Sequence, residues 1–247
     1  MPFDFRAALA AAALALAPQG AAAVSMASSA VSWELRIVSP TPSGTGVEFD
    51  SLAEVVVEFA DSDGLASSFA EASADPDEVV IDTVDSAIDD APIASGTSSS
   101  EASAERTGFG FAIADTFGSV FLVNLLGLSP VEVSLELAYD ISVSASAGDP
   151  ANEFAFAFGS VSVEVFDEFD STIFFDDVGE FADAGFGLPG SDLMGTLAFS
   201  VTVPAESFVE IDVLGLSDAA AAAVPLPLTA PLLLAALGGL ALMRRRA

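Results

Sequence analysis

The 247-residue sequence contains no cysteine, no histidine and no lysine, and all six of its basic residues are arginines. Without cysteine there are no disulfides, so a folded domain must be held together by burial of its many Val, Leu, Ile and Phe side chains. The missing residue types also exclude a Ser-His-Asp triad, a Cys-His pair, a Ser-Lys dyad and a histidine-based zinc site. Paired carboxylates could still serve a glycosidase, but no pair stands out. We therefore expect a protein that is not an enzyme.

Positive charge is scarce as well. Residues 24–223 carry two arginines, Arg36 and Arg106, against thirty-six carboxylates, a formal charge of −34. This charge repels polyanions, so we expect no nucleic-acid partner and no general affinity for anionic lipid. Salt screens the self-repulsion to a Debye length below about 10 Å. The composition thus suggests a protein that works in salty surroundings.

The N-terminus has the order of a secretory signal peptide. A short start with Arg6 precedes an eleven-residue apolar run, Ala7–Ala17, and the small-residue stretch "PQGAAA". Ala21 and Ala23 occupy the −3 and −1 positions for cleavage before Val24. The apolar run is too short to span a bilayer, which takes about twenty residues. We therefore expect residues 1–23 to be recognised by the secretion translocon and removed by signal peptidase.

The middle of the chain alternates with a period of two. In Val131–Ala147 every odd position from Val131 to Val143 is apolar, and most even positions are polar. This pattern predicts a strand with one face on a core and one in water. The same alternation marks further strands at 31–37, 55–59, 109–113 and 197–203, and Pro204–Ala205 separates the last of these from another strand. No stretch shows a sustained helical period, so residues 24–218 are predicted to form an all-β, antiparallel β-sandwich, jelly-roll-like, of eight to ten strands.

Three details of this passenger stay open at the sequence level. Between Glu153 and Phe166 the apolar phase changes at Gly159, which fits either a bulge that keeps both sets on one face or a tight hairpin. Residues 86–108 fit a long loop or a strand of small side chains. Residues 166–190 are interpreted as an acidic, Phe- and Gly-rich connection.

Two groups of side chains are candidates for binding. Hard oxygen ligands in the acidic connection could hold Ca²⁺, although a solvated acidic loop is the commoner outcome. These candidate metal residues are Asp167, Glu168, Asp170, Asp176 and Asp177. Trp33 and Tyr139, the single tryptophan and tyrosine, could form a sugar platform. Both lie on the apolar phase of their strands, so we expect them in the core, together with most of the twenty phenylalanines.

The chain closes on residues 219–247, which we interpret as a membrane-directed tail. A transmembrane helix over about residues 228–243 would be roughly 24 Å long, short but sufficient for a bilayer core. Arg244, Arg245 and Arg246 would then mark its cytoplasmic end. Pro225 and Pro227 keep the preceding backbone extended.

This tail closely resembles the VPLPA-CTERM sorting domain, a relative of the PEP-CTERM tails of Gram-negative bacteria. The matching parts are Val224-Pro225-Leu226-Pro227, the apolar span with Gly238-Gly239, and the arginine cluster; Leu228 stands where the family has alanine. The resemblance covers the last 24 residues. It implies processing by an exosortase-type enzyme near the proline motif.

Together these features predict an exported, surface-sorted, non-enzymatic protein with a structural or adhesive role in the cell envelope or extracellular matrix. It would be membrane-anchored at least transiently. The alternative is a calcium-dependent polysaccharide- or ligand-binding module on the same fold. Apart from that possible Ca²⁺, no cofactor is expected.

Overall fold

The computed structural model describes residues 24–41, 46–76, 80–84, 87, 91–125, 127, 129–148 and 153–223. These residues form nine strands and one 3₁₀ turn: β1 (Val24–Thr41), β2 (Glu48–Asp75), β3 (Val80–Thr83), β4 (Ala94–Val123), β5 (Val131–Ala147), β6 (Phe154–Phe166), β7 (Thr172–Asp183), η1 (Ala184–Phe186), β8 (Gly190–Val203) and β9 (Phe208–Ala222). The predicted all-β class is confirmed for this part of the chain. Within it there is no helix with the length and apolarity to cross a membrane.

All nine strands belong to one antiparallel sheet that bends in the middle of β4. The order is β7-β6-β9-β4-β1-β5-β8, with β2 along β4 and β3 on β2. Residues 94–105 of β4 pair with β1, whereas residues 109–123 pair with β9. We call β8, β5, β1 and residues 94–105 of β4 the β1 half. Residues 109–123 of β4 with β9, β6 and β7 are the β9 half.

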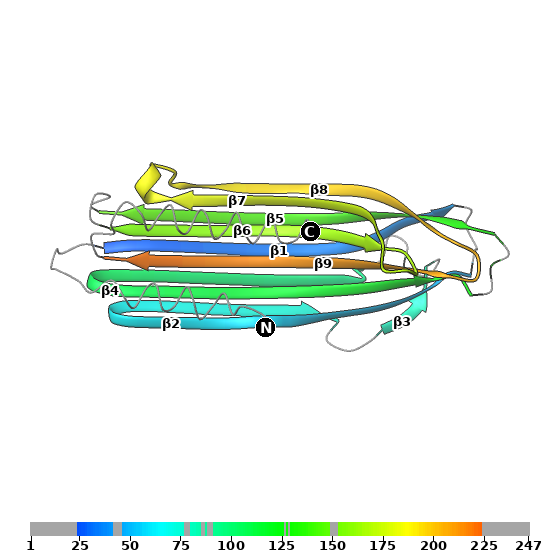
Figure 1. Cartoon of the computed structure of the whole chain (residues 1–247), viewed down its shortest axis with the longest axis horizontal. Helices are drawn as coiled ribbons and strands as arrows, with labels where there is room; N and C mark the ends of the chain where they lie inside the picture. The colour runs from blue at the N-terminus through cyan, green and yellow to red at the C-terminus, as the bar shows by residue number, and fades with distance from the viewer. Residues whose placement is uncertain are drawn as a thin grey trace.

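Two glycines allow the bend. Gly64 of β2 pairs with Gly108 of β4 and has a φ of +71°, in the left-handed region that favours glycine. A Cβ on Gly108 would lie 2.9 Å from the backbone of Leu65, so the two strands pass too closely for a side chain. The register of β2 shifts between Gly64 and Ala66, where the β2–β4 ribbon doubles back (Figure 1). The sheet therefore folds over onto itself.

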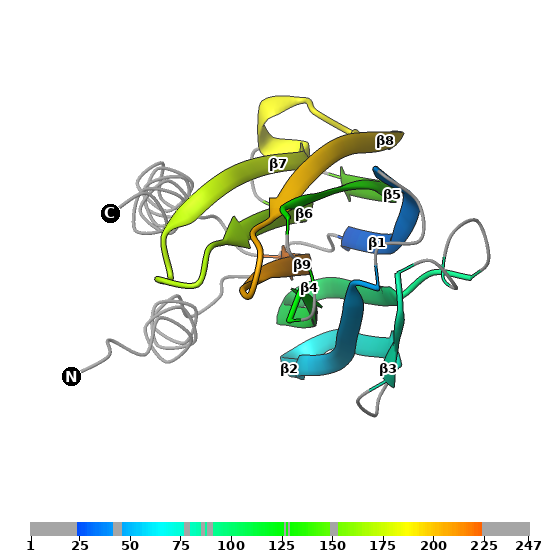
Figure 2. The ribbon, with the colours of Figure 1, turned by 90° about the vertical axis from the view of Figure 1, so that its right-hand side faces the viewer.

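The two halves lie face to face (Figure 2), and apolar side chains fill the interior between them. β1 contacts β9 and β6, and β5 contacts β6, although none of these three pairs is hydrogen-bonded in a ladder. Leu35, Leu137 and Ile141 from the β1 half, and Leu122 and Ile211 from the β9 half, are fully buried. Each such side chain stabilises the fold by about 1.5–3 kcal/mol. The end strands β7 and β8 are linked by a hydrogen bond from Ser191 Oγ to Glu180 Oε2 (2.6 Å), so the folded sheet is nearly closed.

Trp33 spans the interior because three glycines leave room for it. Its indole, 1% exposed, lies against Gly96 on the neighbouring strand and against Gly118 and Gly215 of the β9 half. The indole Nε1 donates a hydrogen bond to Thr116 Oγ1 (2.9 Å), which satisfies the polar atom of a buried ring. The prediction that Trp33 belongs to the core is confirmed, and Tyr139 packs against the same core while keeping part of its surface exposed.

Buried serines also join the halves. Ser217 of β9 donates from Oγ to the Ser29 carbonyl of β1 (2.9 Å), and its hydroxyl lies 2.9 Å from that of Ser100. Ser29 Oγ in turn donates to the Phe158 carbonyl of β6 (2.8 Å). Because buried polar groups must be paired, this chain of hydrogen bonds fixes how the halves sit on each other.

The structure corrects the interpretation of β6. The ladder with β9 runs from Phe154 to Phe166 without a break, so Gly159 is neither a bulge nor a hairpin turn. The interior positions before it are small (Ala155, Ala157, Gly159), because Val31 and Ile141 of the β1 half approach within about 3 Å of where a Gly159 Cβ would be. The two apolar sets therefore lie on opposite faces of β6: the phenylalanines before Gly159 point outward, and the valines after it point into the interior.

Two other boundaries differ from the expectation, and one open alternative is decided. Residues 172–183 of the supposed acidic connection form β7, and Ala94 onward follows the alternative of a strand of small side chains. β9 continues to Ala222, so four alanines assigned to the tail belong to the sheet. The expectation that most phenylalanines are core is wrong: only Phe49, Phe154 and Phe199 are among the buried hydrophobic residues that the structure describes.

Candidate functional surfaces

The outer face of the β1 half, together with the adjoining residues 66–75 of β2, carries many hydroxyl groups. Serine and threonine side chains on neighbouring strands pair across the surface, and we call this surface the hydroxyl face. Its pairs are Ser28–Ser144 (2.8 Å), Ser67–Ser103 (2.8 Å), Ser73–Thr97 (2.7 Å), Ser134–Ser200 (3.1 Å) and Ser142–Asp192 (2.6 Å). Outward serines in β1 and β5 are visible in the sequence alternation, which could have located this face. The strand pairing that gathers them could not be read there.

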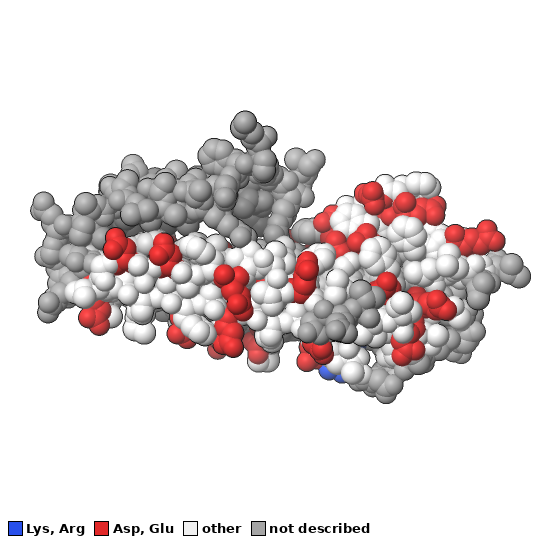
Figure 3. All heavy atoms as spheres, turned by 90° about the horizontal axis from the view of Figure 1, so that it is seen from below, with Lys and Arg blue, Asp and Glu red and all other residues white. Residues whose placement is uncertain are grey.

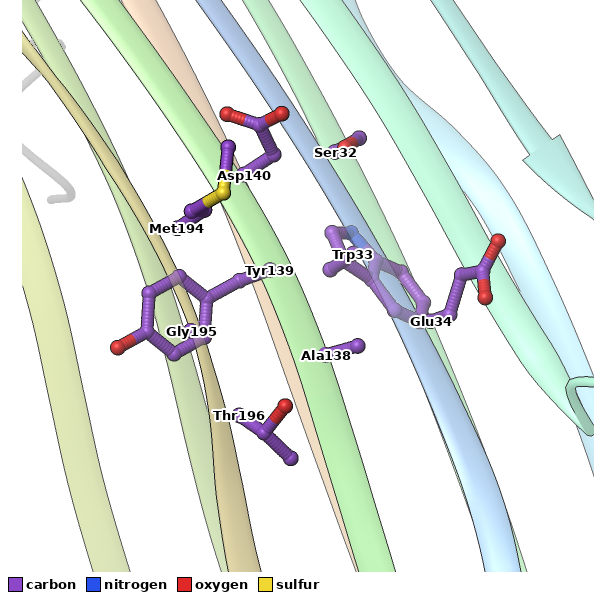
Figure 4. Close-up of a pocket in the computed structure, with 9 residues that line it drawn as sticks. All are labelled: Ser32, Trp33, Glu34, Ala138, Tyr139, Asp140, Met194, Gly195 and Thr196. Carbon is purple, nitrogen blue, oxygen red and sulfur yellow. The ribbon is translucent and has the colours of Figure 1, made fainter.

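Two shallow depressions lie on the hydroxyl face. One, of about 400 Å³, is bordered by Glu34, Asp140 and Met194 and floored by Trp33 and Tyr139 (Figure 4). On the inner side of the same strands, the Tyr139 ring lies beside Gly195, where a Cβ would be 2.5 Å from its hydroxyl. The second, of about 470 Å³, is lined by serines and threonines with Glu71 and Asp140. Both hollows are open to solvent.

Carboxylates are spread over the surface rather than gathered. In Figure 3 they dot the visible face along its whole length. The described residues include one ion pair, Arg36 with Glu34 (2.6 Å), and it is exposed. A surface pair of this kind contributes at most about 1 kcal/mol. The acidic surface therefore acts through its overall field.

Two carboxyl groups are unusual because the fold partly buries them. Burial raises the pKa of Asp212 to about 6, the nearby Glu210 and Glu164 raise it as well, and the Ser119 hydroxyl opposes them. Burial also raises the pKa of Asp183, against hydrogen bonds from the backbone of Gly185 and Phe186. Asp183 has a structural task, since its Oδ1 accepts those hydrogen bonds and begins η1.

The residues proposed for Ca²⁺ do not converge. Asp167 Oδ1 accepts backbone hydrogen bonds from Phe169 and Ser171 (both 2.9 Å) and so closes the β6–β7 turn. Glu168 accepts a hydrogen bond from Ser207 Oγ (2.7 Å), and Asp170 sits in the same turn with a φ of +57°. Asp176 and Asp177 are consecutive in β7, so their side chains point to opposite faces. No group of three or more acidic side chains that could hold a metal occurs among the residues described.

The residues predicted for export and sorting lie outside the described residues. They are Ala21 and Ala23, Val224–Leu228, and Arg244–Arg246. The last described residue, Ala223, donates from its N–H to the carbonyl of Gly108 (3.1 Å). The proline motif therefore begins one residue after a position fixed to the sheet.

Comparison with known proteins identifies no family. No family model matches the chain, and no curated protein matches it. Among solved structures, the enzymatically active domain of tailspike protein 4 of bacteriophage CBA120 has 13% identity and a TM-score of 0.14, over 46% of this chain and 17% of that one. A putative β-galactosidase from Bacteroides fragilis has 6% identity and a TM-score of 0.15, over 70% and 27%. The chain thus spans under a third of either protein, and likeness this low carries no argument.

Proposed function

We propose that this chain is an exported, surface-sorted, non-enzymatic protein that acts structurally or adhesively in the cell envelope or extracellular matrix. The observation that carries the proposal is the VPLPA-like tail, which follows directly in the sequence after the last strand of an acidic β body. Two open hollows on a face rich in hydroxyl groups suit contact with a hydrated surface better than the enclosure of a substrate. The dispersed candidate calcium ligands do not favour the alternative binding module.

We further propose that the folded-over sheet is a jelly-roll-like β-sandwich. Contacts between unpaired strands of the two halves support it, because sandwich cores form from inward side chains of two facing layers. Strands that pass from one layer to the other at a corner, as β2 and β4 do at Gly64 and Gly108, are a known device of such folds. A signal helix before the body and a transmembrane helix over about residues 228–243 complete the proposal.

In this proposal the secretion translocon exports the chain, signal peptidase cuts after Ala23, and an exosortase-type enzyme acts at Val224–Leu228. The hydrogen bond from Ala223 to Gly108 supports this arrangement, because it fixes to the sheet the residue that directly precedes the proline motif. Prolines cannot donate backbone hydrogen bonds, so the motif stays extended and open to a processing enzyme.

The test is intact-mass analysis of the protein recovered from its own host. We expect the parent to lack residues 1–23 and the segment after the proline motif. Replacing Pro225 and Pro227 with alanine should leave membrane insertion intact but cause accumulation of the uncut tail, because the alanine run could then extend into the helix. Replacing Arg244, Arg245 and Arg246 with glutamate should instead disturb retention in the membrane. Equal mass and location of parent and proline variant would show that the tail is only an anchor.

A further inference from the structure

At the end where β9 finishes, the outer face of the β9 half is apolar, although an antiparallel sheet usually presents a polar face to water. Aligned across β4, β9 and β6, one row is Phe109, Ala222 and Phe154, and the next is Phe111, Ala220 and Phe156. We call these six residues the phenylalanine face. The rings on each outer strand stack in pairs, with centroids 6.5 Å apart on β4 and 6.4 Å apart on β6. They form a cluster separate from the interior core.

The chain itself supplies an apolar segment at this place. β9 ends at Ala222, within the phenylalanine face, and Ala223 is held to the Gly108 carbonyl (3.1 Å). The twenty residues that follow, 224–243, carry no charge. A segment joined to its site without a linker has an effective concentration of at least about millimolar, so modest contacts suffice to hold it.

The length and direction of this segment match the face. A chain that leaves β9 at Ala223 and turns back over the sheet runs antiparallel to β9. A helix over residues 228–243 would extend about 24 Å at 1.5 Å per residue. This equals about seven strand residues at 3.3 Å each, from Ala222 back to about Leu216. The arginines after Met243 would then lie over the part of β9 that precedes Leu216.

That part of the same face is acidic. Asp212 and Glu210 point outward from β9, and Glu164 of β6 is the register partner of Asp212. Asp212 is half-buried, and within the described part of the chain its Oδ1 has no hydrogen-bond partner. Three arginines at the end of the helix would supply the missing positive charge. A second copy would instead place carboxylates against carboxylates, and the charge of −34 repels an anionic membrane.

We propose that the phenylalanine face is a docking site for the chain's own C-terminal segment, with residues 228–243 on the rings and Arg244–Arg246 against Asp212, Glu210 and Glu164. Docked in this way, the segment is withheld from the bilayer until another surface takes it. The proposal concerns the intact chain before any processing, and it does not depend on the proposed sorting function.

The absence of cysteine makes a crosslinking test clean. In the full-length chain, Ser160→Cys places a thiol on the outer face of β6, in the same row as Leu216. It is combined in turn with Ala235→Cys, Ala236→Cys or Ala241→Cys, and disulfides are formed by mild oxidation and mapped by mass. The matched control is Ser142→Cys on the hydroxyl face, on the other side of the sheet. We expect at least one tail cysteine to crosslink to position 160 and none to position 142.

Charge reversal tests the arginine contact. Replacing Arg244–Arg246 with glutamates should abolish the crosslink, and adding D212K, E210K and E164K should restore it. Equal yields at positions 142 and 160, or no crosslink at either, would overturn the proposal. So would a crosslink from position 160 to Ala13→Cys in the N-terminal segment in place of the tail. If neutral phosphatidylcholine vesicles shield the cysteine at 160 from a water-soluble thiol reagent, the occupant is the membrane. None of these outcomes changes the masses read from host-derived protein, so the sorting proposal stands or falls separately.

Discussion

Gly96, Gly118 and Gly215 surround Trp33 and form what we call the glycine cage. Their close contact with the indole predicts that one added methyl group will strongly destabilise the fold. In Gly96→Ala the new Cβ would lie 2.6 Å from Trp33 Nε1 and 2.7 Å from Thr116 Oγ1, far inside ordinary contact. Overpacking of this kind costs about 1–3 kcal/mol, and loss of the Trp33–Thr116 hydrogen bond adds about 1 kcal/mol. The lower entropy of the unfolded alanine chain offsets only about 0.4–1 kcal/mol. We expect a net loss of about 2–3 kcal/mol.

Urea denaturation of the full-length protein measures this loss. Trp33 is the only tryptophan, so its fluorescence reports unfolding of the interior directly, with circular dichroism as the second probe. Gly148→Ala is the matched control, because its Cβ would meet only contacts of 3.6 Å or more. Trp33→Phe should reduce the loss of stability caused by Gly96→Ala, because the smaller ring leaves room for the added Cβ. A Gly96→Ala protein as stable as the Gly148→Ala protein would refute the cage.

Three further predictions rest on other parts of the fold. The pKa of Asp212 is raised from 3.8 to about 6 in the folded chain, so between these pH values the folded chain binds a proton that the unfolded chain releases. Protonation of Asp212 therefore increases the free energy of unfolding as the pH falls from 7 toward 4. In chemical denaturation, D212N should be more stable than the parent at pH 7, and its free energy of unfolding should depend less on pH between pH 4 and 6. The exposed E132Q should follow the parent. Identical pH profiles for D212N and the parent would contradict this. Ser217→Ala should cost about 1–3 kcal/mol by leaving its partners Ser29 and Ser100 unsatisfied, while Ser67→Ala on the hydroxyl face should change the free energy of unfolding by less than about 0.5 kcal/mol. Raising NaCl from 10 mM to 1 M should raise the melting temperature, because salt screens thirty-six carboxylates, and a melting temperature independent of salt would rule out self-repulsion as a significant term.

Sequence periodicity predicted strands where one side of the sheet is polar and the other is buried. β5 satisfies this condition, with Val133, Leu135 and Leu137 buried and alternating with Glu132, Ser134 and Glu136, and its predicted bounds are those observed. β6 does not satisfy it, because both of its faces are apolar. There the larger side chains, Phe154 and Phe156, were assigned to the core. The interior instead takes Ala155, Ala157 and Gly159, since Val31 and Ile141 leave no space across the gap.

The candidate surfaces were predicted less well for a different reason. Both depend on which strands become neighbours, and that is decided by the bend at Gly64 and Gly108. The two glycines are 44 residues apart, and neither has a local signal that pairs it with the other. The outward serines of each strand were visible, but the surface they form requires β1 to lie between β4 and β5.

The two outer faces of the folded sheet differ in chemistry and lie on opposite sides of the molecule. The hydroxyl face belongs to the β1 half and the phenylalanine face to the β9 half, and the halves pack inner face to inner face, so the two surfaces point opposite ways. β9 delivers the tail at the apolar side. Whatever holds the tail, whether the docking site or a bilayer beyond it, the hydroxyl face is turned away from that attachment. The adhesive role proposed above would need a contact surface on the side opposite the attached tail, and the bend in β4 produces two such opposite surfaces within a single sheet.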